Sequence, residues 1–202
     1  MTSRPSVVGF DLDMTLIDSR QAILASFAAV ATETGVAIDP AGVDSRLGVK
    51  LETELAYWFP GDEIDAAIAI YRRHYPVLAG PLTIALPGAH EALAGVRSAG
   101  AHAVVITAKF EPTARRSLDD LGLVVDAVYG EAHGPEKGAL LAELGAGVYV
   151  GDTPADMAAA VQGGACPVGV TTGSFTENEL RLAGAKVILA SLAQFPDWYR
   201  DR

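Results

Sequence analysis

The sequence predicts an α/β protein in which helices cover a parallel β-sheet and a further helical segment is inserted near the start. Short apolar runs, each bounded by polar residues or glycine, alternate along the chain with segments of helical spacing, as is typical of a parallel sheet. The stretch 18–83 breaks this alternation, because helical patterns follow one another there without a convincing strand. We therefore expect a Rossmann-like core formed by residues 1–17 and 84–202, with a helical cap at 18–83.

The expected strands are short apolar runs of the kind that are buried on both faces of a sheet. They lie at 6–10, 103–106, 124–125 with 127–129, 148–150, 168–170 and 187–189. Helical spacing predicts core helices at 89–98, 111–121, 137–144, 154–161 and 177–183. In the cap, we expect one helix from a capping-box-like start at Asp18 and Gln21 to a stop at Gly35, and two more over 51–59 and 62–75.

Composition and charge exclude several classes of function. The chain of 202 residues has 15 Lys and Arg against 25 Asp and Glu, a formal net charge of −10, so it lacks the basic surface that binding to nucleic acid or anionic membranes requires. No apolar run approaches the roughly 20 residues of a membrane-spanning helix, and the first residues are not typical of a signal peptide. We expect a cytoplasmic protein that binds neither nucleic acid nor membrane.

Reactive side chains follow three of the predicted strands. Asp11 and Asp13 come after the first strand, Thr107 after the second, and Asp152 after the strand at 148–150. Ligands of open parallel sheets bind beyond the carboxyl ends of the strands, so we expect these side chains to converge. Asp11 and Asp152 suit Mg²⁺, which prefers one or two carboxylates together with water and phosphate oxygens. With Lys137 and the Thr107 hydroxyl as further donors, the pattern predicts phosphoryl transfer.

The order of these motifs resembles that of the haloacid dehalogenase superfamily. The residues that carry the resemblance are Asp11 to Leu16, Thr107-Ala108-Lys109, Lys137, Gly151-Asp152-Thr153-Pro154-Ala155-Asp156 and Gly164-Ala165-Cys166. It covers essentially the whole chain, because 18–83 is similar to the type-one cap of that superfamily. Within it, the chain looks most like phosphoglycolate-phosphatase-like enzymes. The resemblance implies Mg²⁺-dependent hydrolysis of a small phosphorylated metabolite.

The resemblance also implies a role for each residue of the site. Asp11 would be the nucleophile that forms an aspartyl phosphate, and Asp13 the acid that protonates the leaving oxygen and later activates water. Thr107 and Lys137 would hold the phosphoryl oxygens. Asp11, Asp152 and the main-chain carbonyl of Asp13 would hold Mg²⁺.

Further residues would support this site. Thr15 completes the first motif, and Asp156 would either reach the metal through water or orient Lys137. Arg46 and Lys50 lie where type-one caps carry the loop that selects the substrate, and either could contact a carboxylate or a second phosphate. Lys109 is the alternative phosphate lysine, although in this resemblance it more often faces the rim.

Other functions remain open on the sequence alone. A phosphonoacetaldehyde hydrolase would need a cap lysine, for which Lys50 is the candidate, and a sugar phosphomutase would use the same aspartates. A non-catalytic sensor would bind a phosphorylated ligand on the same fold. Asp13 favours a phosphatase over a dehalogenase, because only an alkoxide leaving group needs its proton. Ala108 and the sequence Glu136-Lys137-Gly138 depart from the phosphoglycolate phosphatase pattern and weaken that choice of substrate.

Overall fold

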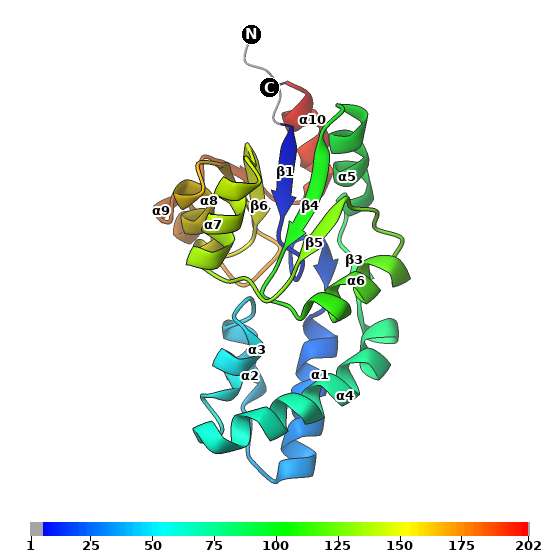
Figure 1. The fold of residues 1–202 in the computed structure, drawn as a ribbon, viewed down its shortest axis with the longest axis vertical. Helices are drawn as coiled ribbons and strands as arrows, with labels where there is room; N and C mark the ends of the chain where they lie inside the picture. Colours follow the sequence, from blue (N-terminus) through cyan, green and yellow to red (C-terminus); the bar gives the residue numbers. More distant parts are fainter. Residues whose placement is uncertain (1–5, 202) are drawn as a thin grey trace.

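The structure, a computed structural model, describes residues 6–201 and consists of two parts stacked along the long axis of the molecule (Figure 1). One part is a parallel sheet with helices on both faces. The other is made of helices and lies beyond one end of the strands. The predicted α/β class with a parallel sheet is therefore confirmed.

Six parallel strands form the sheet in the order β5-β4-β1-β6-β7-β8. Their bounds are Val7–Phe10 for β1, His102–Ile106 for β4, Ala127–Tyr129 for β5, Val148–Gly151 for β6, Cys166–Val170 for β7 and Val187–Leu189 for β8. In register, Val8 of β1 lies between Ala103 of β4 and Val148 of β6. The strand predicted from 124 onward begins only at Ala127, because Val124 is 60% exposed and pairs with no strand.

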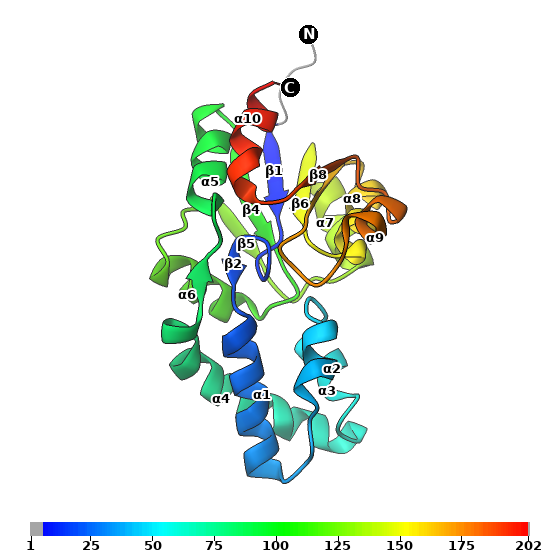
Figure 2. The ribbon, with the colours of Figure 1, turned by 180° about the vertical axis from the view of Figure 1, so that it is seen from behind.

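Helices cover both faces of this sheet. One face carries α5 (Ala89–Ser98), α6 (Glu111–Asp120) and α10 (Phe195–Arg200), and the other carries α7 (Pro135–Glu143), α8 (Pro154–Gln162) and α9 (Glu177–Leu182). Figure 2 shows α5 and α10 on the face of the sheet that is turned toward the viewer. Sequence analysis missed α10 and the 3₁₀ turn η2 (Leu192–Gln194) before it. Phe195 anchors α10 to the sheet, because its ring centroid lies 5.4 Å from that of Phe10.

The helical part has a hydrophobic core of its own, made of residues between 22 and 82. Its elements are α1 (Arg20–Thr34), α2 (Pro40–Ser45), α3 (Leu51–Leu55), η1 (Gly61–Glu63) and α4 (Ile64–Leu82). Helix α4 runs beyond the predicted end at Tyr75 and through Pro76 and Pro81. Tyr75, Ala79 and Leu82 pack against the core of this part, and this burial favours the longer helix despite both prolines.

The two parts are joined by a short antiparallel ribbon. Ile17 of β2 (Ile17–Asp18) pairs with Ala85 of β3 (Ile84–Ala85). Strands of two residues carry no periodic signal, so sequence analysis missed them. The capping box predicted at Asp18 and Gln21 is wrong. Asp18 belongs to β2, and its carboxylate accepts a hydrogen bond from the Arg20 N–H. The N-cap of α1 is Ser19, whose side chain makes no capping hydrogen bond.

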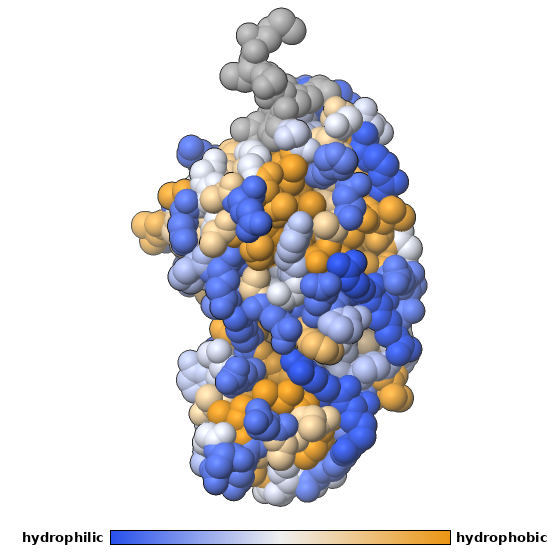
Figure 3. Space-filling model, in the orientation of Figure 1, coloured by the Kyte–Doolittle hydropathy of each residue, from blue (hydrophilic) through white to orange (hydrophobic). Residues whose placement is uncertain are grey.

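The predicted division at 17/18 and 83/84 falls in this ribbon and remains a prediction; residues 18–83 are called the cap below. The space-filling view shows the outline of the molecule narrowing where the cap meets the core (Figure 3). Within residues 6–201, no helix is both long enough and apolar enough to cross a membrane.

Candidate active site

The strand order brings the predicted reactive side chains together at the carboxyl ends of β1, β4 and β6, facing the cap. Asp11 follows β1, Thr107 follows β4 and Asp152 follows β6, and all three are buried. The Asp11 N–H donates to the Val150 carbonyl at 2.8 Å, which ties the first loop to the neighbouring strand end.

A tight turn after β1 presents Asp13. The Leu12 carbonyl accepts from the N–H groups of Thr15, Leu16 and Ile17 at 2.9–3.2 Å. Met14 has a φ of 60°, in the left-handed region that residues other than glycine rarely adopt. Such strain is found at functional sites when the surrounding structure imposes it.

Three buried carboxylates form a cluster that suits a metal ion. One oxygen from each of Asp11, Asp152 and Asp156 lies within 4.8 Å of the others, and the Thr15 hydroxyl donates to Asp152 at 3.1 Å. Burial raises the pKa of Asp11 to about 7, against the lowering effect of the Lys137 ammonium, and burial also raises the pKa of Asp152 well above its usual value. An all-oxygen set of buried carboxylates fits Mg²⁺. The side chain of Asp13 lies outside this cluster. Asp13 was predicted to bind the metal through its main-chain carbonyl, not through its side chain.

Lys137 lies between two of these carboxylates. Its ammonium donates to Asp11 and to Asp156, each at 2.7 Å. Burial alone would lower the pKa of Lys137, but the two carboxylates outweigh it and hold the pKa well above its usual value. The other oxygen of Asp156 accepts from the N–H and the hydroxyl of Thr153 in a capping box that begins α8. Asp156 therefore contacts Lys137, one of the two arrangements predicted for it.

Asp13 is held by a second lysine. The Lys109 ammonium lies 2.9 and 3.2 Å from the two carboxylate oxygens of Asp13, and the Ser19 hydroxyl donates to Asp13 at 2.5 Å. The expectation that Lys109 faces the rim is wrong, because its side chain is only 8% exposed. The Lys109 N–H bonds to the Thr107 hydroxyl at 3.2 Å, and the Tyr75 ring of the cap covers the ammonium at 4.3 Å. Lys137, and not Lys109, contacts Asp11.

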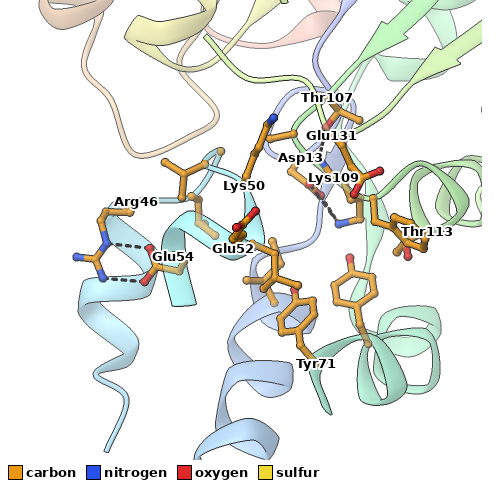
Figure 4. A pocket seen from close by; sticks show the side chains of 18 of the residues that line it. Asp13, Arg46, Lys50, Glu52, Glu54, Tyr71, Thr107, Lys109, Thr113 and Glu131 are labelled. Carbon is orange, nitrogen blue, oxygen red and sulfur yellow. Dashed lines mark hydrogen bonds and ion pairs between the residues drawn. The ribbon is translucent and has the colours of Figure 1, made fainter. Parts of the chain in front are cut away.

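A cavity of about 220 Å³ extends from these strand ends into the cap (Figure 4). Asp11, Asp13 and Thr107 line its core side. Most of its cap side is apolar, and the lining includes residues from α1, α3 and α4 and from the loop 46–50. A small molecule in this cavity would have one end at the reactive carboxylates and the other among side chains of the cap.

Arg46 and Lys50 both line the cavity, as the resemblance implied for the selecting loop, but each already has a carboxylate partner. Arg46 donates twice to the buried Glu54, at 2.8 and 2.7 Å, and the Trp58 indole N–H also donates to Glu54 at 3.0 Å. Lys50 reaches across to the core and pairs with Glu136 at 2.5 Å.

Sequence analysis did not single out Ser19, Glu54 or Tyr75 at this site. The sequence contained an indication for Tyr75: Tyr71 and Tyr75 are four residues apart on the predicted helix, so both side chains lie on the same face. Nothing in the sequence indicated Ser19 or Glu54, because their contacts with Asp13 and Arg46 form only in the folded chain.

The comparisons with known proteins agree with this geometry. The family model of haloacid dehalogenase-like hydrolases matches residues 8–170. The chain belongs to this family. Over an alignment that covers 95% of this chain and 91% of the other protein, it is 29% identical to the probable phosphatase IndB of Dickeya dadantii. A 120-residue part is 32% identical to the tyrosine-protein kinase PtkA of Mycobacterium tuberculosis, covering 59% of this chain and 41% of that protein.

Solved structures of the same fold include a predicted phosphatase from Clostridium acetobutylicum, with a TM-score of 0.85 and 24% identity over 99% of this chain and all of that one. A haloacid dehalogenase-like hydrolase from Streptococcus pneumoniae has a TM-score of 0.84 and 24% identity, over 98% of this chain and all of that one. At this identity, the likeness shows the fold alone, with the cap in place.

Proposed function

We propose that this protein is a Mg²⁺-dependent phosphatase that hydrolyses a small phosphomonoester through an aspartyl phosphate on Asp11. The observation that carries the proposal is the buried cluster in which Asp11, which lines the cavity, lies beside both Asp152 and the Lys137 ammonium. The relative named a probable phosphatase, which is similar over nearly the whole chain, supports the same reaction class.

In the first half of the reaction, an oxygen of the Asp11 carboxylate attacks phosphorus. The bond from phosphorus to the leaving oxygen breaks, and Asp13 gives that oxygen a proton. In the second half, Asp13 takes a proton from water, the water oxygen attacks phosphorus, and the bond from phosphorus to Asp11 breaks. Inorganic phosphate leaves, and both aspartates regain their starting states.

The surrounding residues position these two aspartates and the phosphoryl group. The Lys137 ammonium and the Thr107 hydroxyl would donate to the phosphoryl oxygens, while Asp156 orients Lys137. Lys109 and Ser19 hold the Asp13 carboxylate next to the cavity, and Asp13 takes up from solvent, before the first step, the proton that it then gives to the leaving oxygen. The Lys137 ammonium, only 2.7 Å away, favours the ionised form of Asp11 that nucleophilic attack needs.

The donor set also fits the proposed metal. Asp11, Asp152 and the main-chain carbonyl of Asp13 would hold Mg²⁺, with Thr15 orienting Asp152. When bound, the ion would neutralise charge on the phosphoryl oxygens and favour the ionised carboxylates. The proposed substrate is a small phosphorylated metabolite, for which phosphoglycolate is the candidate that the sequence resemblance implies. The cytoplasmic location remains a prediction.

The test is phosphate release by the purified protein from a panel of phosphorylated metabolites, phosphoglycolate included, with Mg²⁺ and with a chelator. We expect metal-dependent release that falls by about 10³-fold or more in Asp11→Asn, because the nucleophile is lost. Asp62→Asn is the matched control, since Asp62 is exposed on the cap and lies outside the cavity. Equal release by Asp11→Asn and the wild type would refute the proposal.

A further inference from the structure

The cap side of the cavity offers the leaving group a largely apolar surface. Ile23, Phe27, Val43, Leu47, Ile68 and Tyr71 line it and also belong to the hydrophobic core of the cap. The rings of Phe27 and Tyr71 have centroids 5.1 Å apart, and those of Tyr71 and Tyr75 are stacked at 5.6 Å. A leaving group with an apolar body would replace water on this surface.

The cations that line the cavity are already paired. Arg46 pairs with Glu54, Lys50 with Glu136, Arg72 with Glu131 and Lys109 with Asp13. A leaving group that carried a carboxylate or a second phosphate would have to displace one of these partners or lie without a counter-charge. Displacing Glu54 or Asp13 would leave a largely buried carboxylate without its partner, which is strongly disfavoured, whereas the Lys50 and Arg72 pairs are more exposed and are displaced at lower cost.

The acceptors in the cavity wall are, in contrast, available. Glu52 lines the cavity from α3, and its carboxylate has neither a hydrogen bond nor an ion pair within residues 6–201. Figure 4 shows this carboxylate directed into the space between cap and core. The Tyr75 hydroxyl also belongs to the wall. Tyr75 is 1% exposed, and its hydroxyl, which has no hydrogen bond of ordinary length in the described part of the chain, lies near the Lys109 ammonium.

A buried polar group without a partner is disfavoured unless a ligand supplies one. The Tyr75 hydroxyl is such a group. Glu52 is exposed, and its carboxylate contributes differently: an unpaired negative charge on the cavity wall favours a ligand with an ammonium or hydroxyl donor over an anionic one. The cavity, of about 220 Å³, has room for a small ligand such as a phosphate whose leaving group contains one ring.

We propose that the cavity selects phosphomonoesters whose leaving group has an apolar body and a hydroxyl or ammonium donor, and that it disfavours leaving groups with a second anionic charge. The Glu52 carboxylate would accept from the donor. The inference rests on the proposed phosphatase function and names its substrate class. It places phosphoglycolate, whose leaving group carries a carboxylate, among the poor substrates.

The test compares benzyl phosphates that differ only in the para substituent: aminomethyl, hydroxymethyl and carboxylate. The same benzylic oxygen leaves in each, so differences in kcat/KM report mainly on recognition by the cap. For the wild type with Mg²⁺, we expect the aminomethyl compound to exceed the carboxylate by at least about 100-fold, because like charges at close quarters strongly disfavour the wrong partner. Phosphoglycolate is expected to be hydrolysed less efficiently than the hydroxymethyl compound.

The Glu52→Gln variant tests whether the preference for the aminomethyl over the carboxylate compound arises in this cavity. We expect the aminomethyl-to-carboxylate ratio of kcat/KM to fall by about tenfold, which corresponds to about 1.4 kcal/mol. Glu63→Gln is the matched control, because it makes the same change in charge at an exposed cap position outside the cavity, and it should keep the wild-type ratio. Each ratio is measured within one variant, so a loss of folded protein cancels.

The outcomes separate this inference from the proposed function. A preference for the carboxylate compound or for phosphoglycolate overturns the inference and leaves the phosphatase intact. A ratio unchanged by Glu52→Gln also overturns it. Failure to release phosphate from any of these compounds overturns the inference, whereas the proposed function is overturned only if the metabolite panel with Mg²⁺ is not hydrolysed either.

Discussion

Replacing Lys137 by methionine would remove the ammonium that contacts two buried carboxylates. Its side chain is 3% exposed, and the ammonium lies 2.7 Å from both Asp11 and Asp156. Methionine has a similar length without the charge. The variant therefore leaves both carboxylates in place and takes away the group that compensates them.

The expected loss of stability follows from this geometry. Removing one partner of a buried ion pair costs about 3–5 kcal/mol. At this chain length, each kcal/mol shifts Tm by roughly 2–4 °C, so Lys137→Met should lower Tm by roughly 6–20 °C. The loss should be smaller at pH 5 than at pH 8. Burial already raises the pKa of Asp11 to about 7, and without the ammonium this carboxyl would hold its proton to still higher pH.

Calorimetry without metal at both pH values measures this effect. Lys186→Met is the control, because Lys186 is exposed and its loss should change stability by no more than about 0.5 kcal/mol. The double variant Lys137→Met with Asp156→Asn should be more stable than the sum of the single changes predicts, since the second change neutralises an unpaired charge. A Tm of Lys137→Met within about 2 °C of the wild type would refute this interpretation of the cluster.

Three further predictions follow from particular contacts. Gly173→Ala should weaken Mg²⁺ binding, measured by calorimetric titration, by about tenfold or more. A Cβ at position 173 would lie 1.9 Å from an oxygen of Asp152 and would force this carboxylate to move. Unchanged Mg²⁺ affinity would contradict the proposed metal site. Tyr75→Phe should stabilise the free protein by about 1 kcal/mol in chemical denaturation, because it removes a buried hydroxyl without a partner, whereas a loss of stability would show that this hydroxyl is paired. Mg²⁺ affinity should rise with pH through about 7, where Asp11 loses its proton, and a flat profile from pH 6 to 8 would be incompatible with the raised pKa of this carboxyl.

The sheet and the convergence of the reactive residues could be predicted because both depend on local patterns and one topological rule. Runs such as Val148–Val150 are fully buried in the structure, as their apolar character predicts. Once they are placed in a parallel sheet, Asp11, Thr107 and Asp152 must lie at the same edge. The observed strand order then sets β1 between β4 and β6, and so brings the three residues together.

What sequence reasoning missed depends on contacts between distant residues. Lys109 turns inward because Asp13, 96 positions away, and the Tyr75 ring of the cap lie above the same strand end. Arg46 pairs with Glu54 through a bend between α2 and α3 that no periodic pattern describes. The specificity of the cavity could not be predicted for the same reason. A lysine or arginine in a cap loop suggests a site for an anionic ligand, but in the folded chain Arg46 and Lys50 are already paired with carboxylates.

Trapping the covalent intermediate is the most direct test of the role proposed for Asp11. The purified protein would be mixed with Mg²⁺ and an excess of the best substrate, quenched in acid within the first turnover, digested and examined by mass spectrometry. We predict one added phosphoryl group on the peptide that contains Asp11, located at that residue, and none in Asp11→Asn. Phosphate release with the phosphoryl group on another residue would contradict the proposed role of Asp11, as would release with no phosphorylated protein at any quench time.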